Sequence, residues 1–244
     1  MCLGNCSGKF SREHVVTGAL FLGNEITVQG FRWCKSEPKT IGLSSLTAKI
    51  LCRRHNSDLS PLDRAAAHAF ESLRQATRLS NVRSKLRQRI WNVKRFPIDG
   101  RVLERWFLKT LVNLAFEGEY PIGRNSVVAG QPSKDLVEIA FGLNQFDGRA
   151  GLYTVVHVGQ QIEAKDTVQF APLIKKAKGH VAGGLFSFRG FRFLLFLEPE
   201  GIKQLPSGVG FPGEDWGISQ LNFHNEQMRA KVGKYLSHVT EIKW

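Results

Sequence analysis

All four cysteines of the chain lie within its first 52 residues, and none follows in the rest of the 244 residues. They form a C-x3-C pair, Cys2 and Cys6, and a C-x2-H pair, Cys52 and His55, with Cys34 left over. Each short pair can bind a metal ion from one tight turn, and two pairs supply the four sulfur and nitrogen ligands of a tetrahedral site. The spacing therefore predicts structural Zn²⁺ at these two pairs and a buried, apolar role for Cys34. The alternative is four ordinary thiols and a surface histidine.

Composition excludes several classes of protein. Hydrophobic residues make up 42% of the chain and charged residues 23%, which excludes intrinsic disorder and leaves enough apolar material for a core. No apolar run reaches the roughly 18 residues of a membrane-spanning helix, and no basic region followed by an apolar run indicates a secretory signal. The cysteines are too few for a disulfide-stapled scaffold of this size. We expect a cytoplasmic protein without a membrane partner.

The chain is strongly basic, with 34 Lys and Arg against 21 Asp and Glu and a formal net charge of +13. Such an excess favours a polyanionic partner, most often nucleic acid. From Arg74 through Phe96, with Arg74 included, there are eight basic residues and no acidic one. The candidates for nucleic-acid contact in this run are Arg83, Lys85, Arg87, Arg89, Lys94 and Arg95. The alternative is a solvated helix face, which charge runs usually are.

Hydrophobic periodicity favours an α+β protein built from three segments. Residues 1–65 contain the cysteines and short strand-like runs, and the C-x2-H pair of this segment falls at the expected start of a helix. Residues 66–118 form a basic helical segment. Just before this segment, Ser60-Pro61 is typical of an N-cap followed by the first helical residue, and Asp99 within it is a candidate cap for a second helix.

Residues 119–244 are predicted to form an α+β region of mixed strands and helices. Strands are expected over 152–158 and 240–244 and as a pair within 186–196, with Arg189-Gly190 as the turn. The run from Arg189 to Phe196 also resembles the longer signature strand of the RNA-recognition motif. In a Phe-rich segment, however, alternating aromatic residues more often belong to a core.

A second motif lies between and after the metal pairs. Glu13-His14-Val15 is an acid–histidine pair that leads into apolar residues, and Asn56 directly follows His55 in the run Leu51-Cys-Arg-Arg-His-Asn. The order C-x3-C, Glu-His-Val and Leu-Cys-x-x-His-Asn resembles the HNH endonucleases, the ββα-metal nucleases. In many of these enzymes, zinc knuckles bracket the catalytic hairpin and helix. The resemblance covers residues 1–65.

This resemblance implies a zinc-bound ββα-metal module that hydrolyses phosphodiester bonds in DNA. His14 matches the histidine that acts as general base on the attacking water. Asn56 matches the helical residue that binds the catalytic Mg²⁺ or Mn²⁺, and Glu13 matches the acidic residue before the histidine, a second candidate ligand. The residue types suit these roles, since a neutral imidazole accepts a proton near pH 7 and a hard cation stabilises charge on phosphate.

The chain departs from the HNH pattern in three ways. The middle asparagine of the motif has no clear counterpart, with Asn24 a candidate by type and Ser44 or Ser45 candidates by position. The distance between His14 and Asn56 requires an insertion around residues 31–43, and Thr17 occupies the place where a proline commonly follows the Glu-His-hydrophobic step. Two alternatives therefore accompany the nuclease interpretation: a non-catalytic, zinc-containing nucleic-acid-binding protein, and a protein-interaction or toxin–antitoxin-like component.

Overall fold

The computed structural model confirms a mixed α+β fold. It describes residue 6 and residues 8–86, 94–116, 118–155, 165–175, 177–199, 221–223, 228–231 and 238–243. Cys2, Arg87 and Arg89 lie outside the described residues. The α-helices of the described part are α1 (Arg53–Ser84), α2 (Gly100–Ala115) and α3 (Lys134–Phe141). None of the described helices is both long and apolar enough to cross a membrane.

Seven strands form the main sheet, in the spatial order β10-β6-β9-β8-β7-β2-β3. Their bounds are β2 (Glu25–Gln29), β3 (Lys39–Gly42), β6 (Gly151–Val155), β7 (Thr167–Lys175), β8 (His180–Phe188), β9 (Phe191–Phe196) and β10 (Leu221–Phe223). All neighbouring strands are antiparallel except β2 and β7, which are parallel. The sheet thus combines strands from the predicted segments 1–65 and 119–244.

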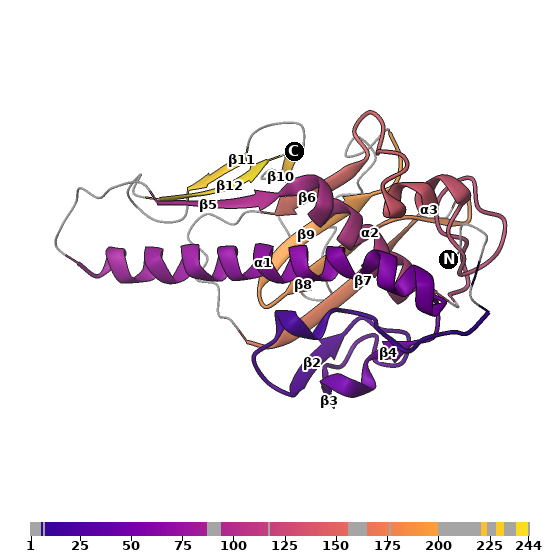
Figure 1. The fold of residues 1–244 in the computed structure, drawn as a ribbon, viewed down its shortest axis with the longest axis horizontal. Helices are drawn as coiled ribbons and strands as arrows, with labels where there is room; N and C mark the ends of the chain where they lie inside the picture. The colour runs from indigo at the N-terminus through magenta and orange to yellow at the C-terminus, as the bar shows by residue number, and fades with distance from the viewer. Residues whose placement is uncertain are drawn as a thin grey trace.

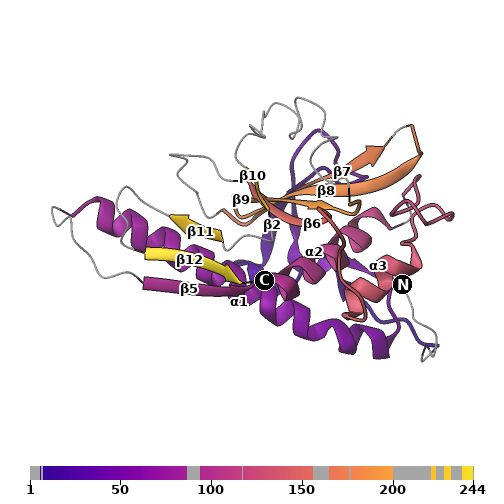
Figure 2. The same ribbon diagram turned by 90° about the horizontal axis from the view of Figure 1, so that it is seen from above.

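Helices α1 and α2 cover one face of the main sheet, and α1 runs along the long axis of the molecule (Figures 1 and 2). Aromatic side chains fill the space between these layers. Phe70 of α1 packs edge-on against Trp106 of α2, and Phe107 lies 4.7 Å from Phe193 of β9 between ring centroids. Burying each large aromatic side chain contributes about 2–3 kcal/mol. This aromatic layer holds α1 in place over the sheet.

A second, three-stranded sheet lies beside α1 (Figures 1 and 2). It contains β5 (Lys94–Asp99), β11 (Met228–Lys231) and β12 (His238–Lys243) in the order β11-β12-β5. Strand β12 pairs in parallel with β5 and antiparallel with β11. The strand predicted over 240–244 is therefore confirmed for residues 240–243 as part of β12. It pairs the last segment of the chain with β5, the strand that precedes α2.

The expected helix start at Ser60-Pro61 is wrong. Helix α1 begins at Arg53, with Cys52 as its N-cap, and contains Pro61 in its interior. A proline at this position removes the N–H that would bond to the Ser57 carbonyl. Both residues are exposed, which leaves that carbonyl open to water. The helix therefore begins at the Cys52–His55 pair, as the position of that pair predicted.

Two other predictions are confirmed. The Asp99 side chain caps α2 by accepting a hydrogen bond of 3.0 Å from the Val102 N–H. Arg189 and Gly190 form the turn between β8 and β9, with positive φ angles of 53° and 82°.

The aromatic residues of β9 are buried, and Tyr153 is 1% exposed. These side chains belong to the interior and do not form the stacking surface of an RNA-recognition motif.

Glu104 is a buried carboxyl group on the sheet-facing side of α2. It is 7% exposed and accepts a hydrogen bond of 2.7 Å from the Leu152 N–H of β6. Burial raises the pKa of Glu104 from 4.5 to about 7, although the hydrogen bond from Leu152 opposes the shift. The folded protein therefore binds this proton more tightly than the unfolded chain, and its stability falls as the pH rises from 4.5 through 7.

We predict that Glu104→Gln removes most of this pH dependence. The glutamine carbonyl can still accept from Leu152 but carries no charge, so the variant should exceed the parent in stability at pH 8 by up to about 3 kcal/mol. Urea unfolding at pH 5 and pH 8 measures the difference. Equal pH slopes for the two proteins would contradict the prediction.

Candidate functional site

The first residues of the chain pair with the stretch that leads into α1. Strand β1 (Glu13–His14) is antiparallel to β4 (Thr47–Ala48), and Phe10 forms a bridge with Cys52. The Ser11 N–H donates to the Leu51 carbonyl at 3.0 Å. Helix α1 follows β4 closely in the chain, so the antiparallel pair of β1 and β4 lies next to the start of this helix.

The residues between β1 and β4 explain the long spacing between His14 and Asn56. They form η1 (Gly18–Leu20), β2, β3 and η2 (Leu43–Ser45), and β2 and β3 join the main sheet. The insertion expected around residues 31–43 falls within this longer segment, which connects the β1–β4 pair to the main sheet.

Three of the four predicted zinc ligands converge in space. The Nδ1 atom of His55 lies 3.2 Å from the Cys52 Sγ and 3.9 Å from the Cys6 Sγ, and all three donor atoms lie within 4.8 Å of one another. In a tetrahedral site with ordinary Zn–S and Zn–N bonds, sulfur and nitrogen are about 3.6 Å apart. This group can hold a metal ion. Cys34 is separate, buried, and contacts the Val28 carbonyl through its thiol at 3.7 Å.

Local structure places these donors. Cys52 is the N-cap of α1, and His55 lies in its first turn. The Arg53 N–H donates to the Lys9 carbonyl at 3.1 Å, which draws the segment around Cys6 toward the helix start. Phe141 packs edge-on against the His55 ring at 5.3 Å between centroids. The imidazole orientation is therefore set by packing as well as by the helix.

We predict that protein purified without chelator contains about one tightly bound metal ion per chain. The substitution Cys52→Ser should remove a thiolate ligand and reduce the bound metal at least about tenfold. Elemental analysis measures the metal content. Cys34→Ser is the matched control and should retain the metal, and equal loss from both variants would contradict the assignment.

A cavity of about 310 Å³ lies beside this metal-binding group, between β1 and the start of α1. It is lined by Arg12, Glu13, His14, Thr17, Asn56, Ser57, Ser60 and Asp63. His14 and Asn56, which the sequence motif pairs, thus both line this cavity. Asn24, Ser44 and Ser45, the candidates for the missing asparagine, are not among the lining residues.

Sequence reasoning missed Ser60 and Asp63 in this cavity. They follow Asn56 by four and seven positions, a spacing that places residues on one face of an α-helix. The Ser60-Pro61 pair conceals this signal in the sequence, because it is typical of a helix start. Because α1 begins at Arg53, the side chains of Asn56, Ser60 and Asp63 lie on one face of the same helix.

A buried ion network joins the cavity to the core. The Lys109 ammonium of α2 lies 2.5 Å from Glu13 Oε1 and 2.9 Å from Asp63 Oδ2. The Trp106 indole N–H also donates to Asp63, at 3.2 Å. Burial raises the pKa of Glu13, and the charge of Lys109 partly offsets the shift. The Glu13 side chain is 4% exposed, and Lys109 is its charged partner.

The chemistry of these donors fits a hard divalent cation. Carboxylate and amide oxygens, which Glu13, Asp63 and Asn56 supply, are the ligands that Mg²⁺ and Mn²⁺ prefer. Glu13 lines the cavity, so its carboxylate lies where such an ion would bind. Lys109 shares the two carboxylates and compensates their charge.

We predict that Lys109→Met destabilises the protein by about 3–5 kcal/mol at pH 7, because it leaves two carboxyl groups near one another without a cation. Urea unfolding measures the loss. The control is Lys134→Met, whose side chain is 89% exposed and which should change stability by less than about 0.5 kcal/mol. A similarly small effect at Lys109 would contradict the role of the network.

The described basic residues of the predicted nucleic-acid-binding set lie in two elements. Arg83 is half-buried near the end of α1, and Lys85 is exposed at its C-cap. Lys94 and Arg95 are exposed at the start of β5, with the Lys94 ammonium 5.4 Å from the centroid of the Phe96 ring. These cations therefore lie at the end of α1 remote from the metal-binding group.

Comparison of the chain with protein-family models, with curated proteins and with solved structures found no match.

Proposed function

We propose that this chain is an HNH-like, metal-dependent endonuclease that hydrolyses phosphodiester bonds in DNA. The observation that supports the proposal best is the shared cavity of His14 and Asn56, two residues 42 positions apart in the chain. The antiparallel pair of β1 and β4 followed by α1 is compatible with the element order of a ββα-metal motif, which supports the proposal. The net charge of +13 suits a nucleic-acid substrate.

In this proposal the metal-binding group is a structural zinc site. Cys6, Cys52 and His55 supply three ligands, and Cys2 is proposed as the fourth. Because Cys52 and His55 flank the first turn of α1, zinc would hold the N-terminal segment against that turn. The same turn carries Asn56, so the zinc site would also fix the position of the cavity's helical wall.

The other side chains of the cavity have three proposed roles: metal binding, phosphate binding and proton transfer. Asn56, Glu13 and Asp63 would hold the catalytic Mg²⁺ or Mn²⁺, which stabilises negative charge on the phosphate and the leaving oxygen when bound. Arg12 contributes a guanidinium that can bind a non-bridging phosphate oxygen through two N–H groups. The His14 imidazole takes the proton of the attacking water at a ring nitrogen.

A second candidate function is a zinc-containing nucleic-acid-binding protein without catalysis. Two observations favour it. No described residue forms a hydrogen bond with the His14 imidazole, so nothing in that part of the chain orients the proposed base. The Glu13 carboxylate is also held by Lys109, which competes with a divalent ion for this ligand.

We predict that His14→Ala lowers the rate of DNA cleavage with Mg²⁺ or Mn²⁺ at least about 100-fold, because the general base is lost. The control is His68→Ala, an exposed histidine of α1 outside the cavity, which should cleave at the parent rate. Both variants should keep the metal content of the parent. Cleavage is measured on labelled duplex and single-stranded DNA.

The outcomes separate the two functions. Full activity of His14→Ala overturns the catalytic assignment. Salt-sensitive binding to DNA by a parent protein that cleaves no DNA favours the non-catalytic alternative.

A further inference from the structure

A second cavity of about 310 Å³ lies farther along α1, and its polar lining is basic. It is lined by Leu22, Arg74, Thr77, Arg78, Asn81, Val82, Lys85, Arg189 and Phe191. Four of these side chains are cationic, and none is acidic. The lining comes from three parts of the chain: α1 with its C-cap, the residues after η1, and the β8–β9 turn with the first residue of β9.

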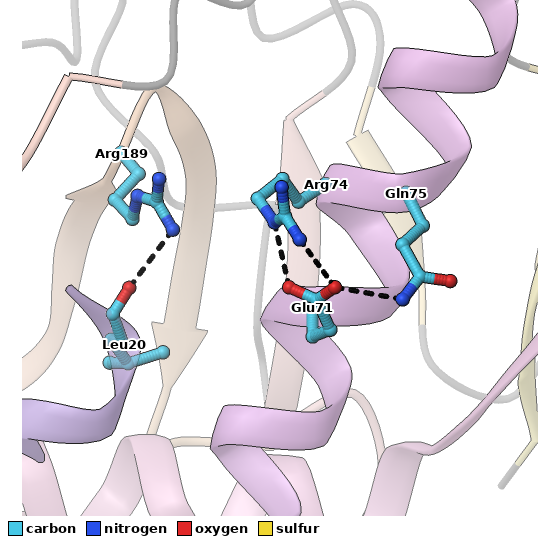
Figure 3. A network of polar contacts seen from close by, with 5 residues as sticks. All are labelled: Leu20, Glu71, Arg74, Gln75 and Arg189. Carbon is cyan, nitrogen blue, oxygen red and sulfur yellow. Dashed lines mark hydrogen bonds and ion pairs between the residues drawn. The ribbon is translucent and has the colours of Figure 1, made fainter. Parts of the chain in front are cut away.

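Arg189 is the buried donor of this second cavity. The residue is 4% exposed, and its Nη1 donates to the Leu20 carbonyl at 3.1 Å (Figure 3). Its Nε lies 3.2 Å from Asp166 Oδ1. Among the described residues, Nη2 is buried without a hydrogen-bond partner. A buried guanidinium with an unused N–H group at a cavity is suited to bind an anion.

The exposed cations add net positive charge to the same place. Arg74 is neutralised by Glu71, which accepts two hydrogen bonds from it at 2.5 and 2.7 Å (Figure 3). Hydrogen bonds from Arg74 and Gln75 lower the pKa of Glu71 to about 2, so this pair stays ionised at neutral pH. Arg78 and Lys85 are exposed, and neither forms an ion pair with any residue that the structure describes.

The two cavities share one flank of α1. Asn56, Ser60 and Asp63 line the first cavity, and the residues 18 positions later, Arg74, Arg78 and Asn81, line the second. Because an α-helix has 3.6 residues per turn, 18 residues are five turns, and each pair points in the same direction. The corresponding separation is about 27 Å along the helix. Between the two cavities, η1 packs against α1.

We propose that the second cavity binds a backbone phosphate of the same nucleic acid whose scissile phosphate lies in the His14 cavity, an inference that rests on the proposed function. Arg189 supplies the buried donor, and Arg78 and Lys85 supply the net charge. A separation of about 27 Å corresponds to about eight base pairs of B-form DNA at 3.4 Å per pair. The cavity thereby sets the position of the duplex relative to the candidate catalytic residues.

A purely solvated helix face accounts for this charge less well. Such a face would need only exposed cations on α1, whereas Arg189 belongs to a different element and is buried. The residue also adopts a positive φ angle in a turn position that favours glycine or asparagine. Arg189, which does not belong to α1, therefore lies at the same cavity as the basic residues of that helix.

The first test uses inorganic phosphate as the probe and requires no nuclease activity. Phosphate should shift the side-chain Nε–H signals of Arg189 and Arg74 in ¹H–¹⁵N NMR spectra of the full chain. The variant Arg78→Ala/Lys85→Ala should bind phosphate at least about tenfold more weakly. Arg124→Ala/Lys178→Ala is the matched control, since it removes one exposed arginine and one exposed lysine outside the cavity. Equal affinity in both variants, or no shift at these arginines, overturns the anion site.

The second test identifies the source of the phosphate. Fluorescence anisotropy of a labelled 20-base-pair duplex, without divalent ions, measures affinity as a function of salt. Arg78→Ala/Lys85→Ala should bind about tenfold more weakly than the control and reduce the slope of log K against log salt by about 2. Phosphate binding combined with equal duplex affinities overturns the nucleic-acid assignment and leaves a site for a small phosphorylated ligand. Because binding is measured without cleavage, failure of the catalytic proposal does not alter these readings.

Discussion

The buried ammonium group of Lys109 joins the three elements that form the candidate site. It extends from α2 to Glu13 of β1 and Asp63 of α1, and its side chain is 2% exposed. Such a charge is tolerated in an interior only when it is paired, so the three elements depend on one another. Trp106 links the same network to the aromatic core, because its indole N–H bonds to Asp63 while its ring packs on Phe70. The geometry of the cavity is therefore coupled to the packing of α2 on α1.

Helix α1 provides the second constraint. It begins at the metal-binding group, forms one wall of the His14 cavity in its first turns, and ends beside the basic cavity. A continuous helix keeps the distance between two sites nearly constant, because every residue adds the same rise and rotation. The packing of Phe70 against the sheet prevents α1 from moving as a free arm. Spacing between the proposed phosphate positions thus follows from the length of one helix.

Several features of the fold could be predicted because they depend on neighbours in the chain. The Asp99 cap, the Arg189-Gly190 turn and the position of Cys52–His55 at a helix start each involve residues within four positions of one another. Local spacing also made Cys6, Cys52 and His55 candidates for one metal site. Their convergence, however, requires the pairing of residues 10–15 with 46–52. The pairing partner was not visible in the sequence because a sheet-forming insertion separates the two strands.

Other features could not be predicted because their causes lie far apart in the chain. Asp63 and Lys109 are 46 positions apart, and neither belongs to a recognisable motif. Proline inside a helix normally destabilises the helix, so the sequence favours Pro61 as a first helical residue. In the structure, Ser57 is exposed and its carbonyl can bond to water, so α1 continues through Pro61. The aromatic residues of β9 have the alternation of a stacking surface, and only the position of α1 and α2 over the sheet shows Phe191 and Phe193 to be core.

The sequence by itself determined the local chemistry: the short Cys and His pairs, the acid–histidine pair at Glu13–His14, the basic run, the Asp99 cap and the Arg189-Gly190 turn. These depend on short-range geometry, which a few consecutive residues specify. The tertiary structure alone decided which of these groups meet. It placed His14 and Asn56 at one cavity, Glu13 against Lys109, and Arg189 beside the flank of α1. Such arrangements form only when the sheet and the helix layer pack on a common core.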